Sequence, residues 1–146
     1  MQIRKATTSD IKLLAELMMQ FNAEESIINS PSQVSAAISS AFLHPELVSS
    51  YIAHSAGTTI GYINVTYTYS FEFMGIEVAI DEIFILPQHR RSGAASRLIS
   101  QIESEAKKLG AVVISGDIAD NKPWLKSFYV RNGFSMAAYR PYYKAL

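Results

Sequence analysis

The first hydrophobic pattern along the chain is that of an amphipathic helix. It begins at a capping-box pattern, Thr7 followed three residues later by Asp10. The apolar positions recur every three or four residues and are Ile11, Leu14, Ala15, Met18 and Phe21. The pattern breaks between Asn22 and Ser32, which predicts a loop containing two adjacent glutamates. A second helix is predicted from about Ser32 to Leu43.

Alternating and continuous apolar segments predict the strands of a sheet. Gln2 to Lys5 alternates and reads as a short strand. Residues 47–71, rich in β-branched and aromatic side chains, predict a hairpin that reverses at Gly57. Residues 76–86, "IEVAIDEIFIL", are nearly apolar on both faces, as expected of a central strand covered on two sides.

The last third of the chain alternates between helix and strand. A helix from Arg91 to Leu109, ended by Gly110, is predicted from its apolar positions, which are Leu98, Ile99, Ile102, Ala106 and Leu109. "AVVIS" then reads as a short buried strand, and a helix follows with Pro123 in its first turn and Gly133 at its end. Residues 134–146 predict one or two final strands. The whole chain, 1–146, is therefore expected to form one α/β domain.

Composition narrows the classes of function. The chain of 146 residues has 13 basic and 13 acidic residues, so its net charge gives no general attraction to nucleic acid or an anionic membrane. It has no cysteine, which excludes disulfides, thiolate zinc sites and a cysteine acyl-enzyme. His44, His54 and His89 lack metal-ligand spacing, so no metal site is predicted. The N-terminal segment lacks the apolar core of a signal peptide, which favours the cytoplasm.

The junction between the central strand and the third helix reads "RRSGAA", Arg90 to Ala95. A helix N-terminus presents unpaired backbone N–H groups and a positive dipole end, which together bind phosphate-like anions. Small residues at such a junction serve close packing equally well, so the pattern alone leaves both interpretations open. The loop is neither a Walker loop nor a dinucleotide fingerprint.

A second motif, "FYVRNGF", spans residues 128–134 on the last helix and its exit. Tyr129 lies one turn before Gly133, which ends that helix. Taken alone, it is either a functional group or a core tyrosine with a bonded hydroxyl.

Together the two motifs resemble the GCN5-related N-acetyltransferase (GNAT) family. The family's Arg/Gln-x-x-Gly-x-Gly/Ala loop after a central strand is matched by "RRSGAA", preceded by "IFILP". Its Tyr-x-x-x-Gly-Phe signature is matched by "YVRNGF". The C-terminal sequence "YYKAL" is similar to the C-terminal sequences of many family members. The resemblance covers nearly the whole chain. It implies a GNAT-like single domain with a central mixed, mostly antiparallel sheet and helices on both faces.

The resemblance also implies acetyl-CoA as cofactor. Its pyrophosphate would be held by the loop amides, its pantetheine would lie along the central strand like an added strand, and Tyr129 would protonate the departing CoA thiolate. The cofactor-binding residues expected on this basis are Phe84, Ile85, Leu86, Arg90, Arg91, Ser92, Gly93, Ala94, Ala95, Ser96, Asn121 and Phe128. Trp124 stands where the family has an alanine, and we expect it to be a packing anchor.

Transfer to an amine requires a base, because amines are mostly protonated near neutrality. Asp81 and Glu82 are the candidates, since adjacent acids in an apolar strand are costly unless paired or used. Alternation sends them to opposite faces. Glu82 is preferred, because polyamine acetyltransferases of this family carry an acid pair at these positions. The alternative is that both acids pair with arginines of the neighbouring helix.

The expected acceptor is a small cationic amine, such as a polyamine, a diamine or an amino sugar. Acidic and aromatic side chains suit a cation, and those expected on the acceptor side are Glu24, Glu25, Glu72, Glu77, Tyr67, Tyr69, Phe71 and Phe73. Solvated surface acids explain the glutamates equally well. A peptide or protein acceptor, or a non-catalytic acyl-CoA sensor, stays open. The expected partners are the amine and a second subunit in a homodimer, with no nucleic acid or membrane.

Overall fold

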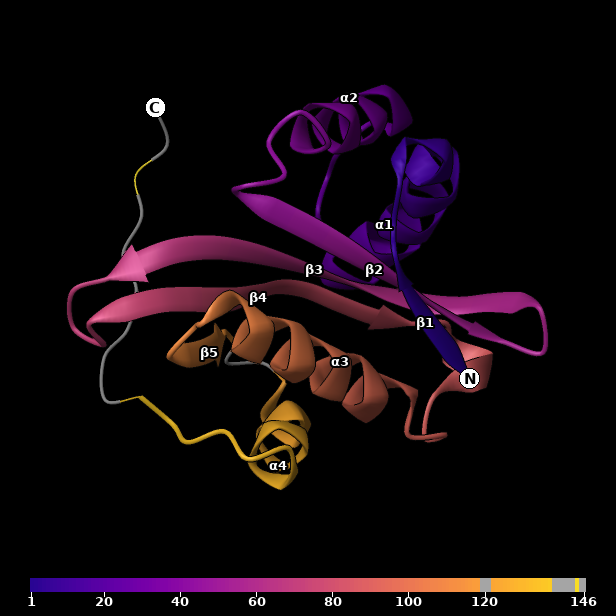
Figure 1. The fold of residues 1–146 in the computed structure, drawn as a ribbon. Coiled ribbons are helices and arrows are strands. Elements are labelled where there is room, and N and C mark those ends of the chain that lie inside the picture. Colours follow the sequence, from indigo (N-terminus) through magenta and orange to yellow (C-terminus); the bar gives the residue numbers. More distant parts are fainter. Residues whose placement is uncertain (119–121, 138–143, 145–146) are drawn as a thin grey trace.

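A computed structural model describes residues 1–118, 122–137 and 144 of the chain. In this part of the chain, five strands form one sheet in the order β1-β2-β3-β4-β5 (Figure 1). Strands β1 to β4 pair antiparallel, and β5 pairs parallel to β4. The strands are β1 (Gln2–Lys5), β2 (Val48–Ser55), β3 (Thr58–Ser70), β4 (Gly75–Ile85) and β5 (Val113–Gly116).

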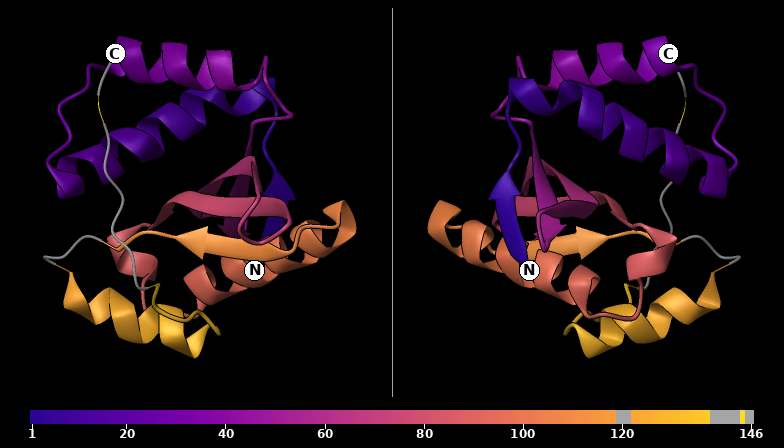
Figure 2. Two further views of the ribbon diagram at one scale, coloured as in Figure 1. Left: turned by 90° about the vertical axis from the view of Figure 1, so that its left-hand side faces the viewer. Right: turned by 90° about the vertical axis from the view of Figure 1, so that its right-hand side faces the viewer.

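Helices cover both faces of the sheet, as Figure 2 shows. The helices are α1 (Ile11–Glu25), α2 (Pro31–Ala41), α3 (Ala94–Leu109) and α4 (Pro123–Arg131). Helices α1 and α2 lie on one face, and α3 and α4 lie on the other. The predicted class, a mixed and mostly antiparallel sheet between helical layers, is confirmed. Among the described residues, no helix is long and apolar enough to cross a membrane.

Each face of the sheet has its own hydrophobic core. The core under α3 includes Tyr51, Ile63, Val78, Ile80, Leu98, Ile102 and Tyr129. The core under α1 and α2 includes Leu14, Leu17, Ile52, Tyr62 and Phe84. The apolar segment of β4 contributes to both cores, as predicted for a central strand.

The start of α1 is built around the carboxylate of Asp10. This carboxylate accepts the backbone N–H of Thr7 at 2.8 Å, as the capping box predicts, and both terminal nitrogens of Arg4 at 2.7 Å. The Arg4 hydrogen bonds hold the pKa of Asp10 well below its usual range. The ion pair between the exposed Arg4 and the buried Asp10 therefore joins β1 to the start of α1. Helix α1 continues three residues past the start of the predicted break, to Glu25.

Two further predictions about the elements differ from the structure. Helix α3 begins at Ala94 rather than Arg91, because Arg91 and Gly93 have left-handed φ angles of 58° and 81°. Residues 134–137 are irregular where a final strand was predicted. The rest of that prediction, residues 138–143 and 145–146, lies outside the described residues.

Candidate active site

The sheet changes its pairing at one point in β4, and the site is centred there. Asn64 of β3 pairs with Glu82, but the next residue, Val65, pairs with Ile80. Asp81 is therefore the extra residue of a β-bulge, a feature common next to active sites. Strand β5 pairs with β4 only as far as Ile80, so the two strands part where the bulge begins.

The bulge also changes which face each residue of β4 occupies. Ile80 belongs to the core under α3, whereas Phe84 belongs to the core under α1. The side chain of Glu82 bonds to Tyr62, which is also in the α1-side core. Strict alternation, on which the expectation of opposite faces for Asp81 and Glu82 rested, is therefore interrupted here.

Glu82 is held in place by two neutral donors from β3. Its Oε2 accepts the Tyr62 hydroxyl at 2.9 Å and the Asn64 amide nitrogen at 3.0 Å. Burial raises the pKa of Glu82, and the nearby charge of Asp81 raises it further, while the two hydrogen bonds oppose the shift. The alternative that Glu82 pairs with an arginine of the neighbouring helix is wrong.

Asp81 has a different environment. Its side chain belongs to an exposed residue and makes no ion pair with any described residue. Partial desolvation still raises the pKa of its carboxyl group. Asp81 is exposed and Glu82 is partly buried, so the carboxylate of Asp81 is the more hydrated of the two. The structure thus distinguishes the two acids: Glu82 is partly buried and hydrogen-bonded, whereas Asp81 is exposed.

The loop before α3 has the features of an anion site. The first backbone hydrogen bond of the helix runs from the Arg97 N–H to the Gly93 carbonyl at 3.1 Å. The N–H groups of residues 93–96 thus have no partner within the helix. A side chain at Gly93 would meet no atom within 4 Å, so the glycine leaves open space beside those groups. Ala94 is buried in the core, so its small size does serve close packing.

Arg90 is tied to the protein rather than free. Its Nε donates to the Ile85 carbonyl at 2.8 Å, and its Nη2 donates to both carboxylate oxygens of Glu24 at 2.7 Å. The guanidinium also lies over the ring of Phe84, 5.6 Å from its centroid. Glu24 therefore balances the charge of Arg90. Arg91, which is exposed, has no ion-pair partner among the described residues.

The two adjacent glutamates of α1 are both used in ion pairs. Glu24 pairs with Arg90, and Glu25 pairs with Lys122 in the segment before α4. A cationic acceptor would therefore have to compete with Arg90 or Lys122 for these carboxylates, and their expected role on the acceptor side stays a prediction. In the structure the two glutamates join α1 to the two segments on the other side of the sheet, the loop before α3 and the start of α4.

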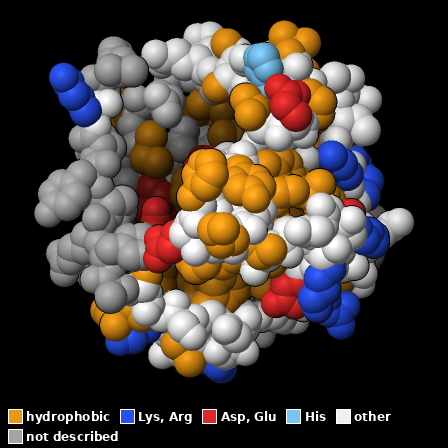
Figure 3. Space-filling view, turned by 60° about the vertical axis from the view of Figure 1, so that its left-hand side comes forward, with side chains coloured by type: hydrophobic (Ala, Val, Ile, Leu, Met, Phe, Trp, Pro, Cys, Tyr) orange, Lys and Arg blue, Asp and Glu red, His pale blue; other side chains and the backbone are white. Residues whose placement is uncertain are grey.

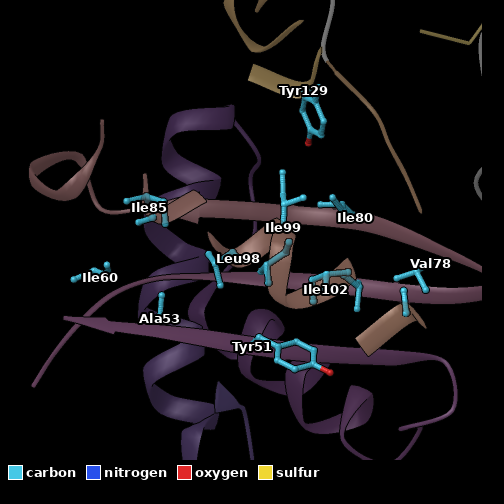
Figure 4. Close-up of a cluster of buried hydrophobic side chains, with 14 residues drawn as sticks. Tyr51, Ala53, Ile60, Val78, Ile80, Ile85, Leu98, Ile99, Ile102 and Tyr129 are labelled. Atoms are coloured by element: carbon cyan, nitrogen blue, oxygen red, sulfur yellow. The ribbon is translucent and has the colours of Figure 1, made fainter. Parts of the chain in front are cut away.

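Tyr129 lies in the core under α3, and its hydroxyl lies where the pairing of β4 and β5 ends. Its ring packs edge-on against Phe128 and Phe134, with centroids 5.3 and 5.1 Å away. A Cβ atom at Gly116, the last residue of β5, would lie 3.5 Å from the Tyr129 hydroxyl. Figure 4 shows this hydroxyl pointing toward Ile80 and Ile99. It makes no hydrogen bond to any residue that the structure describes, and burial raises its pKa, with the charge of Asp117 adding to the effect.

Tyr129 and Glu82 approach the parted strands from opposite faces. The ring of Tyr129 belongs to the core under α3, and Glu82 contacts Tyr62 of the core under α1. The bulge and the free N–H groups of α3 complete the arrangement. The structure thus places the predicted tyrosine and acid beside the bulge in β4 and the predicted loop after the end of the same strand.

The other predicted cofactor residues have different environments. Leu86 packs against the core under α1, and the Ser92 hydroxyl donates to the His89 carbonyl at 2.7 Å. The side chains of Phe84 and Ile85 are buried in the two cores, so only backbone groups could contact a ligand, and the Ile85 carbonyl already accepts the Nε of Arg90. Phe128 is half-buried beside Tyr129. Asn121 lies outside the described residues. Trp124 is 64% exposed, so its predicted role as a packing anchor is wrong.

The predicted aromatic lining of the acceptor side lies elsewhere. Tyr67 packs in the core under α3, on the opposite face from Glu82. Tyr69, Phe71 and Phe73 are exposed at the tip of the β3–β4 hairpin, where Figure 3 shows hydrophobic side chains gathered. Five residues of extended strand separate Tyr69 from Asn64, roughly 16 Å. These aromatic residues therefore do not line the neighbourhood of Glu82.

The two acids predicted with them are also remote from the bulge. Glu72 is exposed in the hairpin turn, and Glu77 lies near the start of β4, opposite Thr68. A cavity of about 530 Å³ lies in the same part of the molecule, between the sheet and the C-terminal half of α3. None of the residues predicted for catalysis or cofactor binding lines this cavity. No cluster of three metal-binding side chains occurs in the described ranges.

Sequence reasoning missed two residues of the site, Tyr62 and Asn64. Both lie on β3 and hold Glu82 from the neighbouring strand. The available signal was an asparagine within the apolar run "TIGYINVTY", where an amide is costly unless bonded. Its partner depends on the register of β3 and β4, which the sequence did not reveal.

Comparison with known proteins adds independent information. A family model for the acetyltransferase (GNAT) domain matches residues 47–136. An uncharacterized N-acetyltransferase of Bacillus subtilis (strain 168), YhfO, is 29% identical over 138 residues, covering 92% of this chain and 89% of the relative.

Two further similarities are to proteins that act on aminoglycosides. An aminoglycoside N(6')-acetyltransferase type 1 of Acinetobacter genomosp. 13 is 37% identical over 62 residues, which cover 42% of this chain and 38% of that protein. The structure of AAC(6')-Iy with the bisubstrate analogue CoA-S-monomethyl-acetylneamine has a TM-score of 0.84 and 19% identity, covering 99% of this chain and 97% of that one.

Proposed function

The chain belongs to the GNAT acetyltransferase family and is an N-acetyltransferase, and we propose that it transfers the acetyl group of acetyl-CoA to the primary amine of a small cationic acceptor, directly in a ternary complex. The observation that carries the proposal is the partly buried, hydrogen-bonded Glu82 carboxylate at the bulge, with the Tyr129 hydroxyl on the other side of the parted strands.

The described residues suit the cofactor. The N–H groups at the start of α3, beside the open space at Gly93 and the charge of Arg91, would hold the pyrophosphate. Beyond Ile80 the edge of β4 has no strand partner in the described part of the chain, so its backbone would pair with the pantetheine arm. Acetyl-CoA supplies the acetyl group as a thioester.

The protein's own groups move the protons. Glu82, as the carboxylate, accepts a proton from the ammonium group of the acceptor, so that the nitrogen gains a free electron pair. Its raised pKa brings its basicity closer to that of the amine than an ordinary glutamate would have. The Tyr129 hydroxyl, kept protonated by its raised pKa, holds a proton for the departing sulfur.

An amino sugar is the acceptor that we propose within the class of small cationic amines. The acid pair at the bulge favours a cation, which a polyamine or a diamine would also satisfy. The similarity to aminoglycoside acetyltransferases supports the amino sugar over these two.

The test is CoA release from acetyl-CoA with separate pools of amino sugars, polyamines, amino acids and short peptides. Glu82→Gln and Tyr129→Phe should each lower kcat by about 100-fold to 10,000-fold, because each removes a proton-transfer group. The matched controls are Glu77→Gln, on the same strand, and Tyr51→Phe, in the same core, and both should keep wild-type turnover.

The pools separate the alternatives. Release with peptides alone would contradict the small-amine proposal and indicate a peptide or protein acceptor. Silence in every pool, with acetyl-CoA still binding, would favour a sensor. Unchanged turnover in Glu82→Gln would overturn the role of the bulge carboxylate.

A further inference from the structure

Arg90, in the loop before α3, has a side chain that is fixed by three separate contacts. Its Nε donates to the Ile85 carbonyl at 2.8 Å, and its Nη2 donates to both carboxylate oxygens of Glu24 at 2.7 Å. Its guanidinium lies 5.6 Å from the centroid of the Phe84 ring. The first and third contacts join the loop to β4, and the second joins it to the last turn of α1.

The backbone that follows Arg90 has a conformation that needs such support. Arg91 and Gly93 have left-handed φ angles of 58° and 81°. This conformation is unfavourable for a residue with a side chain, so Arg91 keeps it only where the surrounding contacts hold the chain. One such contact crosses the turn, where the Ser92 hydroxyl donates to the His89 carbonyl at 2.7 Å. The anchored side chain of Arg90 is the other.

The N–H groups of this loop lie where a ligand can reach them. Residues 91–93 are exposed, and a Cβ atom at Gly93 would meet no atom within 4 Å. Successive backbone N–H groups in a turn with a left-handed residue form a concave site for an anion. The φ angles of the loop set the directions of these groups. The anion site therefore exists only while the loop keeps this conformation.

Glu24 places a negative charge beside this anion site. Its side chain is 40% exposed, and it lies within hydrogen-bond distance of the guanidinium of the loop. A carboxylate in this position repels a phosphate group through its charge. Any benefit that Glu24 brings to phosphate binding must therefore come from its contact with Arg90.

We propose that Glu24 is a positioning residue for the cofactor: it acts through Arg90 and holds the loop before α3 in the conformation that directs its N–H groups at the pyrophosphate of acetyl-CoA. This inference rests on the proposed function of the chain. It assigns Arg90 to the support of the loop. Arg91, which has no ion-pair partner in the described part of the chain, is then the arginine that contacts the anion.

The proposal predicts an effect opposite in sign to that of charge alone. Removal of the Glu24 carboxylate would strengthen acetyl-CoA binding if repulsion were its only effect. Repulsion between exposed charges is screened by salt, whereas a loop that changes conformation loses several N–H contacts to the anion at once, so binding should weaken. S-acetylpantetheine has no phosphate group, so its binding should not depend on the loop.

The experiment measures the Kd of acetyl-CoA by calorimetric titration and the Kd of S-acetylpantetheine by nuclear magnetic resonance titration. Glu24→Ala removes the carboxylate, and Glu24→Gln removes its charge but keeps one acceptor oxygen for Arg90. The matched control is Glu25→Ala, which removes the same charge at the next position of α1 and breaks the ion pair with Lys122. Glu24→Ala is also made together with Arg90→Met.

Glu24→Ala should raise the Kd of acetyl-CoA by about threefold to tenfold and leave the Kd of S-acetylpantetheine unchanged. Glu24→Gln should have a smaller effect of the same kind. Glu25→Ala should keep the wild-type ratio of the two constants. When Arg90→Met is already present, Glu24→Ala should no longer weaken acetyl-CoA binding, because a residue that acts through another has no effect in its absence.

Unchanged or tighter acetyl-CoA binding in Glu24→Ala would overturn the inference. An equal loss of affinity for both ligands would also overturn it, because that result indicates a general structural effect. Both results leave the proposed function standing. A wild-type protein that binds acetyl-CoA no more tightly than S-acetylpantetheine would instead overturn the proposed pyrophosphate site, and the inference with it.

Discussion

The chemistry of Glu82 depends on four immediate influences. Burial and the charge of Asp81 raise its pKa, and the hydrogen bonds from Tyr62 and Asn64 lower it. The net shift is upward, because burial is the largest of these effects. The charge of Asp81 and the two hydrogen bonds each belong to one side chain, so each of these three influences can be removed by a single substitution.

The first prediction concerns the acid limb of the pH profile of kcat/KM. Activity needs the carboxylate, so it should rise with pH through the pKa of Glu82 in the free enzyme. Tyr62→Phe removes a donor that stabilises the carboxylate, so the limb should move to higher pH. Asp81→Asn removes a negative charge that destabilises the carboxylate, so the limb should move to lower pH. Initial rates from pH 4 to 9, measured with one acceptor for the wild type and each variant, give both shifts of the acid limb.

The opposite signs make this prediction specific. The pKa of the acceptor amine contributes equally to all three profiles, so it cancels in the comparison. Loss of turnover at every pH in Asp81→Asn, with the protein still folded, would indicate instead that Asp81 is the base.

At the scale of elements, the turn into α3 is decided by backbone conformation. Gly93 has a φ of 81° and lies beside open space, so its lack of a side chain serves the backbone angle and leaves room for a ligand. Gly57, in the β2–β3 turn, has a φ of 78° and the same open surroundings. A substitution would therefore cause similar backbone strain at both glycines, but only Gly93 lies at the start of α3.

The second prediction uses this pair. Gly93→Ala and Gly57→Ala should each lower the free energy of unfolding by about 1 kcal/mol, because alanine is strained at these angles. Only Gly93→Ala should weaken acetyl-CoA binding, by about tenfold or more, since it alters the N–H groups at the helix start. Urea unfolding and calorimetric titration measure the two effects. Equal acetyl-CoA affinity in both variants would contradict the proposed pyrophosphate site.

At the scale of the whole molecule, the proposed cofactor site draws on several elements from both layers. Arg90 and Glu24 connect the loop before α3 to α1, and Lys122 and Glu25 connect the segment before α4 to the same helix. A cofactor bound at the end of β4 would therefore stabilise contacts across the whole domain. The expected homodimer and cytoplasmic location stay predictions.

The third prediction is a rise in melting temperature with acetyl-CoA. Saturation at about 100 times Kd stabilises the native state by about 2.7 kcal/mol, which corresponds to roughly 5 to 11 °C for a domain of this size. Tyr129→Phe should show the same rise, because it keeps the packed ring and removes only the hydroxyl. Differential scanning calorimetry measures both. A folded protein whose melting temperature does not respond to acetyl-CoA would contradict the proposed cofactor.

The sequence by itself determined most of the elements and the contiguous parts of the site. Periodicity, the capping box at Thr7 and Asp10 and the glycine signals depend on residues within a few positions of each other, so they can be read along the chain. The order of elements, the loop before α3 and the acid pair Asp81 and Glu82 follow from such local patterns. The preference for Glu82 and the expected role of Tyr129 came from the resemblance to the GNAT family.

Only the tertiary structure decided which partners these residues meet. The bulge at Asp81 and the bonds of Glu82 to Tyr62 and Asn64 depend on the register of two strands, about 20 residues apart in sequence. The pairing of Glu24 with Arg90 spans 66 positions, and that of Glu25 with Lys122 spans 97. Sequence patterns report on neighbours along the chain, whereas these ion pairs and the hydrogen bonds of Glu82 arise between residues that are neighbours only in space.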